Sequence, residues 1–345
     1  MIGASNINEE GTRQFLTKHE WPVGFQSLLI TQVTEKIPLR FFICDDSGSM
    51  FENDGKQLVT KGAISKALEC TRWKELSDSM RFHVELAKES NAPSEFRLLN
   101  ALAPKMVGDP HADPDFSNVR ALNKVFDGGP SGGTPLCRHI NDVVNFIKHH
   151  EQQLRQNGQV VSLVICTDGV ASDGDVTVAM RPLKQLPVMI VIRLCTNSDD
   201  VVAYWNKVEK DLEMDLDIID DFFGEGKGVH EHNPWICYGE PLQRLREFGV
   251  HVKELDMLDE KMLTALQMKK FMSYLFGCKA QDVPDPQFDW ATFEAWVANQ
   301  LKALPITFNP NTVSTGLEPW IDMRNLRTCY RPPNAPNAGG CCSIS

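Results

Sequence analysis

The fold is decided by one stretch, Leu39–Met50, which reads LRFFICDDSGSM. Its first half, Leu39–Cys44, is almost continuously apolar, which predicts a central strand of a parallel sheet with both faces covered. The second half is a cluster of carboxylates and hydroxyls around a glycine. Hard oxygen ligands of this kind suit magnesium, manganese or calcium better than zinc or copper. The stretch therefore predicts a strand that ends in a polar site.

Other apolar runs repeat this arrangement along the chain. Val160–Cys166 predicts a second buried strand, which is followed by the carboxylate of Asp168, and Val188–Leu194 predicts a third. Helical patterns lie between the strands, for example over Leu136–Gln156. This alternation predicts an α/β fold with a doubly wound, mostly parallel, Rossmann-like sheet and helices on both faces. Because ligands of such folds bind at the carboxyl ends of the strands, Asp45 and Asp168 occupy the expected place.

Less regular patterns fill the rest of the chain, and Trp21–Lys36 fits no single element. The remaining predictions rest on the spacing of apolar residues and on glycine and proline signals. They are a polar lead-in over residues 1–20, a long helical pattern over Lys56–Ser90 with one break, a strand over Glu95–Asn100, a loop over Pro104–Pro114, helices over Asp200–Leu212 and Pro241–Phe248, an acidic, glycine-rich connection over Asp215–Asn233, a strand over Val250–Leu255, and helices over Asp259–Phe276 and Trp290–Leu304.

Composition and charge argue against several classes of protein. A chain of 345 residues with 42% hydrophobic residues can bury a substantial core. Its formal charge of -11 argues against a nucleic-acid binder, which needs a basic face. No apolar run approaches the roughly 20 residues that cross a bilayer, and Met1–Asn6 lacks the features of a secretory signal. The ten cysteines fall mostly in apolar segments, which predicts reduced thiols and a cytoplasmic protein.

Two further motifs supply oxygen ligands at other strand ends. A glycine-rich loop, Asp127–Leu136, contains Ser-Gly-Gly-Thr-Pro and leads into a predicted helix. A Thr-Asp-Gly motif follows the second buried strand. With Asp-x-Ser-x-Ser after the first strand, three separated segments contribute to one set, which is more specific than any single motif. The predicted metal-ligating residues are Asp45, Ser47, Ser49, Thr134 and Asp168.

This set resembles the metal-ion-dependent adhesion site (MIDAS) of von Willebrand factor type A (VWA) domains, and the resemblance covers roughly residues 37–277. It implies that the serines and the threonine ligate the ion through hydroxyls, while the aspartates act directly or through water. Neutral ligands leave the charge of a hard cation largely unquenched. The resemblance therefore implies a Mg²⁺ (or Mn²⁺ or Ca²⁺) site that captures an Asp or Glu of a protein partner. Intracellular type A proteins such as copines further suggest an adaptor or scaffold and not an enzyme.

Alternative interpretations of the same oxygens stay open. A Mg²⁺-dependent hydrolase, either phosphatase or esterase, could use the cluster. The sequence around Ser47 faintly resembles the nucleophile loop of trypsin-like proteases. The 44 residues before Asp45, however, show no pattern of their two barrels, and their only histidine is His19. Haloacid-dehalogenase-type phosphatases need a second aspartate where this chain has Ser47. Asp45 and the serines could also cap a turn or helix, and Asp173-Gly174-Asp175 predicts a turn with a helix cap rather than a calcium loop.

The last four residues, Cys342–Ser345, match a prenylation motif in which serine at the final position favours farnesyl. Cys341 is a candidate for palmitoylation, and the alternative is two unmodified thiols. Lipidation would add membrane association without a transmembrane segment. The predicted organisation is an N-terminal extension over 1–36, a VWA domain over 37–277, a C-terminal helical extension over 278–330 and a disordered tail over 331–345.

Overall fold

A computed structural model gives the fold and describes residues 7–333, except for 62–63, 197, 215 and 313–316. The predicted lipidation residues, Cys341 and Cys342, lie outside the described residues. Within the described part of the chain, no helix combines the length and the apolar character that crossing a membrane requires.

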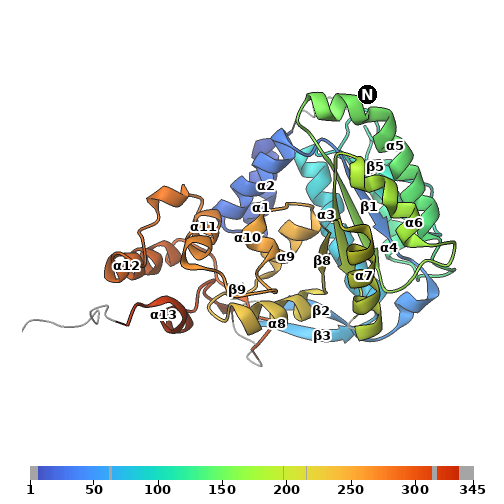
Figure 1. The fold of residues 1–345 in the computed structure, drawn as a ribbon. Helices are drawn as coiled ribbons and strands as arrows, with labels where there is room; N and C mark the ends of the chain where they lie inside the picture. The colour runs from blue at the N-terminus through green and yellow to red at the C-terminus, as the bar shows by residue number, and fades with distance from the viewer. Residues whose placement is uncertain (1–6, 62–63, 197, 215, 313–316, 334–345) are drawn as a thin grey trace, which may run out of the picture.

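A six-stranded sheet forms the centre of the molecule, in the order β5-β4-β1-β6-β7-β8 (Figure 1). The middle strand β1 pairs in parallel with β4 and β6, β7 and β8 continue in parallel, and the edge strand β5 is antiparallel to β4. The predicted α/β class, with a mostly parallel sheet flanked by helices, is confirmed. The strands are β1 (Arg40–Cys44), β4 (Ser94–Leu98), β5 (Lys105–Val107), β6 (Val161–Thr167), β7 (Val188–Leu194) and β8 (Asp217–Ile219).

The two faces of the sheet pack against different helices. Because side chains alternate along a strand, Phe41 and Ile43 of β1 enter one core while Phe42 and Cys44 enter the other. The first layer contains α5 (Leu136–Gln156), α6 (Val176–Met180), η2 (Arg181–Gln185) and α7 (Asp199–Leu212), with α5 along the right of Figure 1. The second layer contains α1 (Glu9–Lys18), α2 (Val23–Glu35), α3 (Arg72–Ser90), α4 (Ser117–Phe126), α8 (Phe222–His232), α9 (Glu240–Glu247), α10 (Lys253–Asp256) and α11 (Ala265–Phe276).

The N-terminal segment is helical and packs into the second layer. The predicted polar lead-in over residues 1–20 is therefore wrong over α1, whose N-cap Asn8 accepts a hydrogen bond from the Gly11 N–H. In α2, Gly24 lies so close to the last turn of α11 that an added Cβ would clash with backbone atoms there. The Phe25 ring lies 6.4 Å from Phe271, edge on. Helices α1 and α2 are thus part of the main core.

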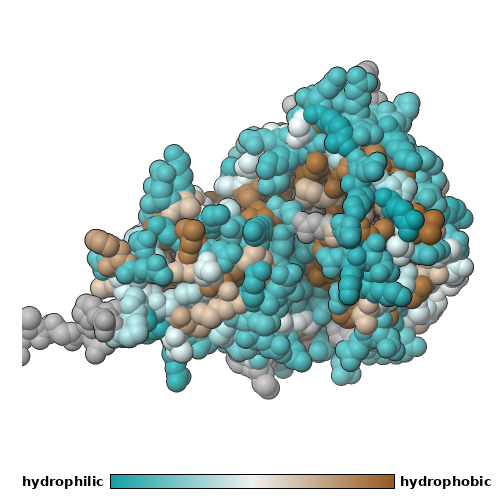
Figure 2. Space-filling view, viewed as in Figure 1, coloured by the Kyte–Doolittle hydropathy of each residue, from teal (hydrophilic) through white to brown (hydrophobic). Residues whose placement is uncertain are grey.

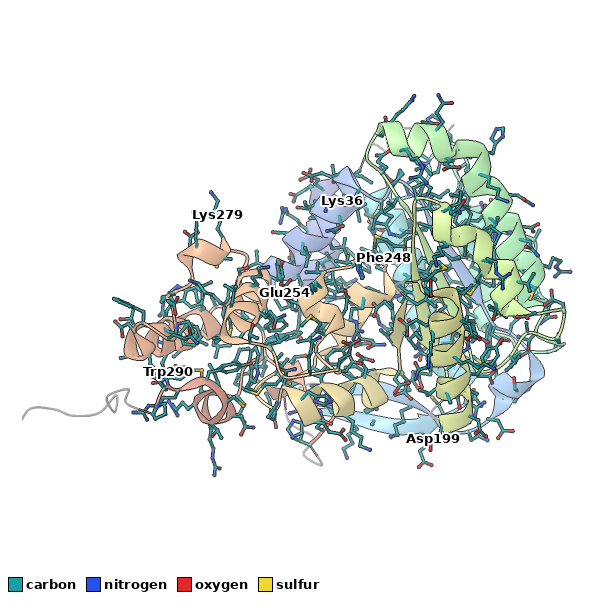
Figure 3. The ribbon with its side chains drawn as sticks, in the orientation of Figure 1. Lys36, Asp199, Phe248, Glu254, Lys279 and Trp290 are labelled. Carbon is teal, nitrogen blue, oxygen red and sulfur yellow. The ribbon has the colours of Figure 1, made fainter. Side chains whose placement is uncertain are left out.

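The C-terminal segment continues the second layer away from the sheet, at the left of Figure 1. A predicted helix over Trp290–Leu304 is confirmed as α12, and Trp290 is labelled at its start in Figure 3. Figure 2 shows apolar side chains among the residues of this segment. A cleft of about 700 Å³ is lined by the end of α12, the start of α13 and the chain between them. The elements are η3 (Ala280–Asp282), α12 (Trp290–Leu301), β9 (Thr307–Phe308), β10 (Leu317–Glu318) and α13 (Met323–Tyr330).

The long helix predicted over Lys56–Ser90 is wrong in its first half. An antiparallel hairpin, β2 (Gly55–Lys61) and β3 (Ile64–Cys70), precedes α3. The spacing of apolar residues in this stretch does not distinguish a helix from a hairpin. The hairpin lies on α3, whose carboxylates accept hydrogen bonds from it. The Lys56 N–H donates to Glu75 Oε2 at 2.9 Å, and Gln57 Nε2 donates to Asp78 Oδ2 at 2.6 Å.

Two further predictions fail around β8. The acidic connection over Asp215–Asn233 contains β8 and α8, and the predicted strand over Val250–Leu255 is instead an irregular turn followed by α10. Strand β8 has an acidic first residue, Asp217, which is buried and accepts a hydrogen bond from Arg246 Nη2 at 2.9 Å. Hydropathy cannot reveal a strand whose charge is neutralised by an ion pair from a distant helix.

Candidate metal centre

The centre lies where β1 and β6 end side by side. The Asp45 N–H donates to the Cys166 carbonyl at 2.9 Å, which continues the parallel pairing one residue past β1. After β1 the chain builds β4 on one side of this strand, and later returns to build β6 on the other side. Asp45 and Asp168 therefore follow the two strands at which the strand order reverses, the usual ligand site of open α/β sheets.

Hydrogen bonds join four of the five predicted ligand residues into one cluster. Ser47 Oγ and Ser49 Oγ lie 3.0 Å apart, and Ser49 Oγ donates to Asp168 Oδ1 at 2.8 Å. Asp45 Oδ1 accepts from the Ser47 N–H at 2.9 Å, and its Oδ2 accepts from Thr167 Oγ1 at 2.7 Å. Both oxygens of Asp45 thus already orient the loop, whereas the serine hydroxyls extend the cluster toward the exposed position of Ser49.

The glycine-rich loop is attached to the same strand end. The Gly48 N–H donates to the Gly132 carbonyl at 3.1 Å, and the Ser131 N–H donates to the Asp46 carbonyl at 2.7 Å. Gly132 has a φ of +96°, and an added Cβ would lie 2.6 Å from Asn100 Oδ1. A glycine is therefore required for this close approach.

Thr134 lies in that loop, and its backbone is bound to Ser172 and not to the oxygen cluster. Its N–H donates to Ser172 Oγ at 3.1 Å, and its carbonyl accepts from the Ser172 N–H at 2.8 Å. Ser172 belongs to the loop that follows Asp168, so the loops after β1, before α5 and after β6 are mutually bound. The side chain of Thr134 is partly exposed at this junction.

Asp46 holds the loop after β4 against the loop after β1, a role that the sequence did not predict. Its Oδ1 accepts from the backbone and side-chain N–H groups of Asn100 at 2.8 and 2.9 Å, and its Oδ2 accepts from the Ala101 N–H at 2.9 Å. Asn100 Nδ2 also donates to the Gly133 carbonyl at 2.9 Å. The local sequence does not distinguish Asp46 from Asp45. The partners of Asp46, Asn100 and Ala101, follow β4 and become its neighbours only when the sheet forms.

Burial is the main influence on the pKa values of the two carboxylates that follow β1. Burial raises the pKa of Asp45, the charge of Asp168 raises it further, and hydrogen bonds from Ser47 and Thr167 oppose both effects. Burial likewise raises the pKa of Asp46 above its ordinary value. The two strand-end carboxylates therefore repel one another, and a cation between them would relieve that repulsion.

The guanidinium of Arg72 lies beside the cluster, and no sequence motif predicted this contact. Arg72 Nη1 donates to Asp168 Oδ2 at 2.9 Å, while Arg72 Nε and Nη2 donate to the two oxygens of Asp54 at 2.6 Å each. Arg72 is the first residue of α3, whose N-cap Thr71 accepts from the Lys74 N–H at 3.1 Å. Thr71 as an N-cap residue could have indicated that a helix begins at Arg72. It was overlooked because Lys56–Ser90 was predicted as one helical stretch.

The neighbouring acidic motif has the structural role predicted for it. Asp173 Oδ1 and Oδ2 accept from the N–H groups of Cys137 and Arg138 at 2.9 Å each, which caps α5. Asp175 caps α6 by accepting from the Thr177 N–H at 2.8 Å. Among the described residues, no three His, Cys, Asp or Glu side chains form a group that could hold a metal. The candidate centre depends instead on two carboxylates and on hydroxyls, a donor set for hard cations.

Comparisons with known proteins add no family to these observations. No protein-family model matches the chain, and no match was found among curated proteins.

Proposed function

We propose that this chain is a VWA-domain protein that binds a divalent cation and uses it to recruit a partner through an Asp or Glu side chain. The observation that carries the proposal is the hydrogen-bonded series Ser47–Ser49–Asp168, which joins two neighbouring strand ends. The serine and aspartate oxygens of this series are of the kind that a MIDAS uses. The sheet order, which reverses at these two strands, is compatible with the same fold family.

The residues present fit a hard cation. Ser47, Ser49 and Asp168 supply neighbouring oxygens, and Thr134 would add a hydroxyl from the glycine-rich loop. Asp45 would hold the loop in place for the ion, since its two oxygens accept from the Ser47 N–H and from Thr167 Oγ1. When bound, Mg²⁺, Mn²⁺ or Ca²⁺ would supply an electrophilic centre for an additional carboxylate oxygen. The protein's own contribution is to hold the hydroxyls in place and to leave Ser49 accessible.

Large exposed apolar side chains next to the cluster support a macromolecular partner. Phe51, two residues after Ser49, is 56% exposed, and Val170, two residues after Asp168, is 50% exposed. Aromatic and apolar side chains around a polar contact are typical of the centres of protein interfaces. The same surroundings favour an adaptor or scaffold role over the alternative Mg²⁺-dependent phosphatase or esterase.

The test compares metal binding with turnover. Titration calorimetry with Mg²⁺ and Mn²⁺ is expected to show a single site in the wild type and none in the double variant Ser47→Ala/Ser49→Ala. Ser27→Ala, which removes a hydroxyl from α2, is the matched control and is expected to bind like the wild type. Absence of binding in a folded wild type contradicts the metal site. Metal-dependent hydrolysis of p-nitrophenyl phosphate or acetate, lost in the double variant, would support the hydrolase instead.

A further inference from the structure

The guanidinium of Arg72 connects the candidate metal centre to a carboxylate outside it. Arg72 Nη1 lies 2.9 Å from Asp168 Oδ2, and Nη2 lies 2.6 Å from Asp54 Oδ2. The side chain of Arg72 is 14% exposed, that of Asp168 is 1% exposed and that of Asp54 is 46% exposed. One buried and one accessible carboxylate therefore share a single, permanently charged group.

Each carboxylate oxygen of Asp168 accepts a hydrogen bond from a different donor. Its Oδ1 accepts from Ser49 Oγ at 2.8 Å, and its Oδ2 accepts from Arg72 Nη1 at 2.9 Å. The guanidinium thus engages one of the two carboxylate oxygens and places a positive charge beside the cluster. Since like charges repel strongly when poorly solvated, a divalent ion bound to Asp168 would weaken its contact with Arg72.

Arg72 also binds Asp54, and this contact does not depend on Asp168. It binds the guanidinium through two parallel hydrogen bonds, Nε to Oδ1 and Nη2 to Oδ2, each 2.6 Å long. Such bidentate pairs are the strongest arrangement of an arginine with a carboxylate. Gly55 and Cys70 face each other where the β2–β3 hairpin begins and ends, so Asp54 and Arg72 flank its base. The Arg72–Asp54 pair is therefore anchored by the backbone of the hairpin.

We propose that Arg72 is a competing internal cation that sets the metal affinity of the centre, releasing Asp168 when a divalent ion binds while remaining on Asp54. This inference rests on the proposed function, because it presupposes a cation at Ser47, Ser49 and Asp168. Arg72 lowers the affinity for the ion, and Asp54 limits that reduction by holding the released guanidinium. The two residues therefore have opposite effects on metal binding.

The experiment measures the Kd of Mn²⁺ by titration calorimetry on the full chain. Arg72→Met, which removes the charge but keeps an apolar stem, is expected to tighten binding about tenfold, the factor set by one charge-assisted hydrogen bond. Asp54→Asn is expected to weaken binding several-fold, because Arg72 then has Asp168 as its main partner. Arg120→Met is the matched control, since Arg120 forms an exposed pair with Asp115 at 3.6 Å.

Failure of this inference and failure of the proposed function give different results. If the wild type binds Mn²⁺ and Arg72→Met keeps the same Kd, or Asp54→Asn binds more tightly, Arg72 does not compete and the metal centre stands. If neither the wild type nor Arg72→Met binds Mn²⁺ while both unfold cooperatively, the metal centre itself is wrong, and the inference with it. Asp54 is accessible to solvent, so its variant tests the competition even where Arg72→Met fails to fold.

Discussion

Ser49 and Asp168 follow different strands and are 119 residues apart in the sequence, yet Ser49 Oγ donates to Asp168 Oδ1 at 2.8 Å. Asp168→Asn preserves an acceptor for Ser49 but removes the charge that would hold a divalent ion. We expect the wild type to be stabilised by about 2.7 kcal/mol at Mn²⁺ concentrations 100-fold above Kd. The variant is expected to show no Mn²⁺-dependent rise in melting temperature. A rise equal to that of the wild type would remove Asp168 from the centre.

A buried ion cluster between α9, β7 and α3 is expected to be essential for stability. Glu247 Oε2 accepts from Arg244 Nη1 and from Ser79 Oγ at 2.8 Å each, and Arg193 Nε donates to Glu247 Oε1 at 3.4 Å. Glu247→Gln leaves two arginines without this counter-charge, which we expect to cost ~3–5 kcal/mol of unfolding free energy in urea titrations. In the exposed pair Glu151–Arg155, Glu151→Gln is expected to cost less than about 0.5 kcal/mol.

The same cluster is expected to make the free energy of unfolding depend on pH near neutrality. Burial lowers the pKa of His83 despite its hydrogen bond to Glu247, with Nε2 3.1 Å from Oε2. Since the folded-state pKa lies below the unfolded value of about 6.5, the unfolded chain takes up the proton first as pH falls. The free energy of unfolding is therefore expected to decrease as pH drops below about 6.5. His83→Gln, which can still donate to Glu247, should reduce the decrease between pH 7 and pH 5.5, measured in urea. An unchanged pH dependence would contradict this role.

The contact between α2 and α11 depends on the absence of a side chain at Gly24. A Cβ there would clash with the carbonyls of Tyr274 and Leu275 and with the Gly277 N–H. Although alanine in place of glycine favours a helix by about 1 kcal/mol, we expect Gly24→Ala to destabilise the protein by roughly 1–3 kcal/mol through forced separation of the helices. Thermal unfolding measures the effect. Gly169→Ala, where an added Cβ meets nothing within 4 Å, is expected to be nearly neutral.

The sequence was sufficient for the features that depend on local patterns. Continuous apolar runs predicted the buried strands β1, β6 and β7, and the helix over Leu136–Gln156 has the predicted bounds. The motif around Ser47 and Ser49 placed the oxygen cluster at a strand end, because parallel strands bring their carboxyl ends to one edge. Metal ligation by these residues stays a prediction.

The sequence was insufficient wherever distant residues complete an element. Strand β8 contains Asp217, whose charge is neutralised by Arg246, 29 residues later. The β2–β3 hairpin donates hydrogen bonds to carboxylates of α3, and Arg72 donates to Asp168 across 96 residues. For Asp217 and for Asp168, the decisive partner is brought into contact by the tertiary fold, which spacing along the chain does not encode.

The two edges of the sheet restrict how another protein can approach it. Edge strands β5 and β8 are three residues each, Lys105–Val107 and Asp217–Ile219, whereas β6 and β7 in the interior have seven. Short edges with charged residues are a common protection against pairing with a foreign strand. β-Augmentation and edge-to-edge aggregation are consequently disfavoured at the six-stranded sheet. Under the proposed function, recognition would use the loops at the strand ends, where a single side chain of a partner, and not its backbone, would make the decisive contact.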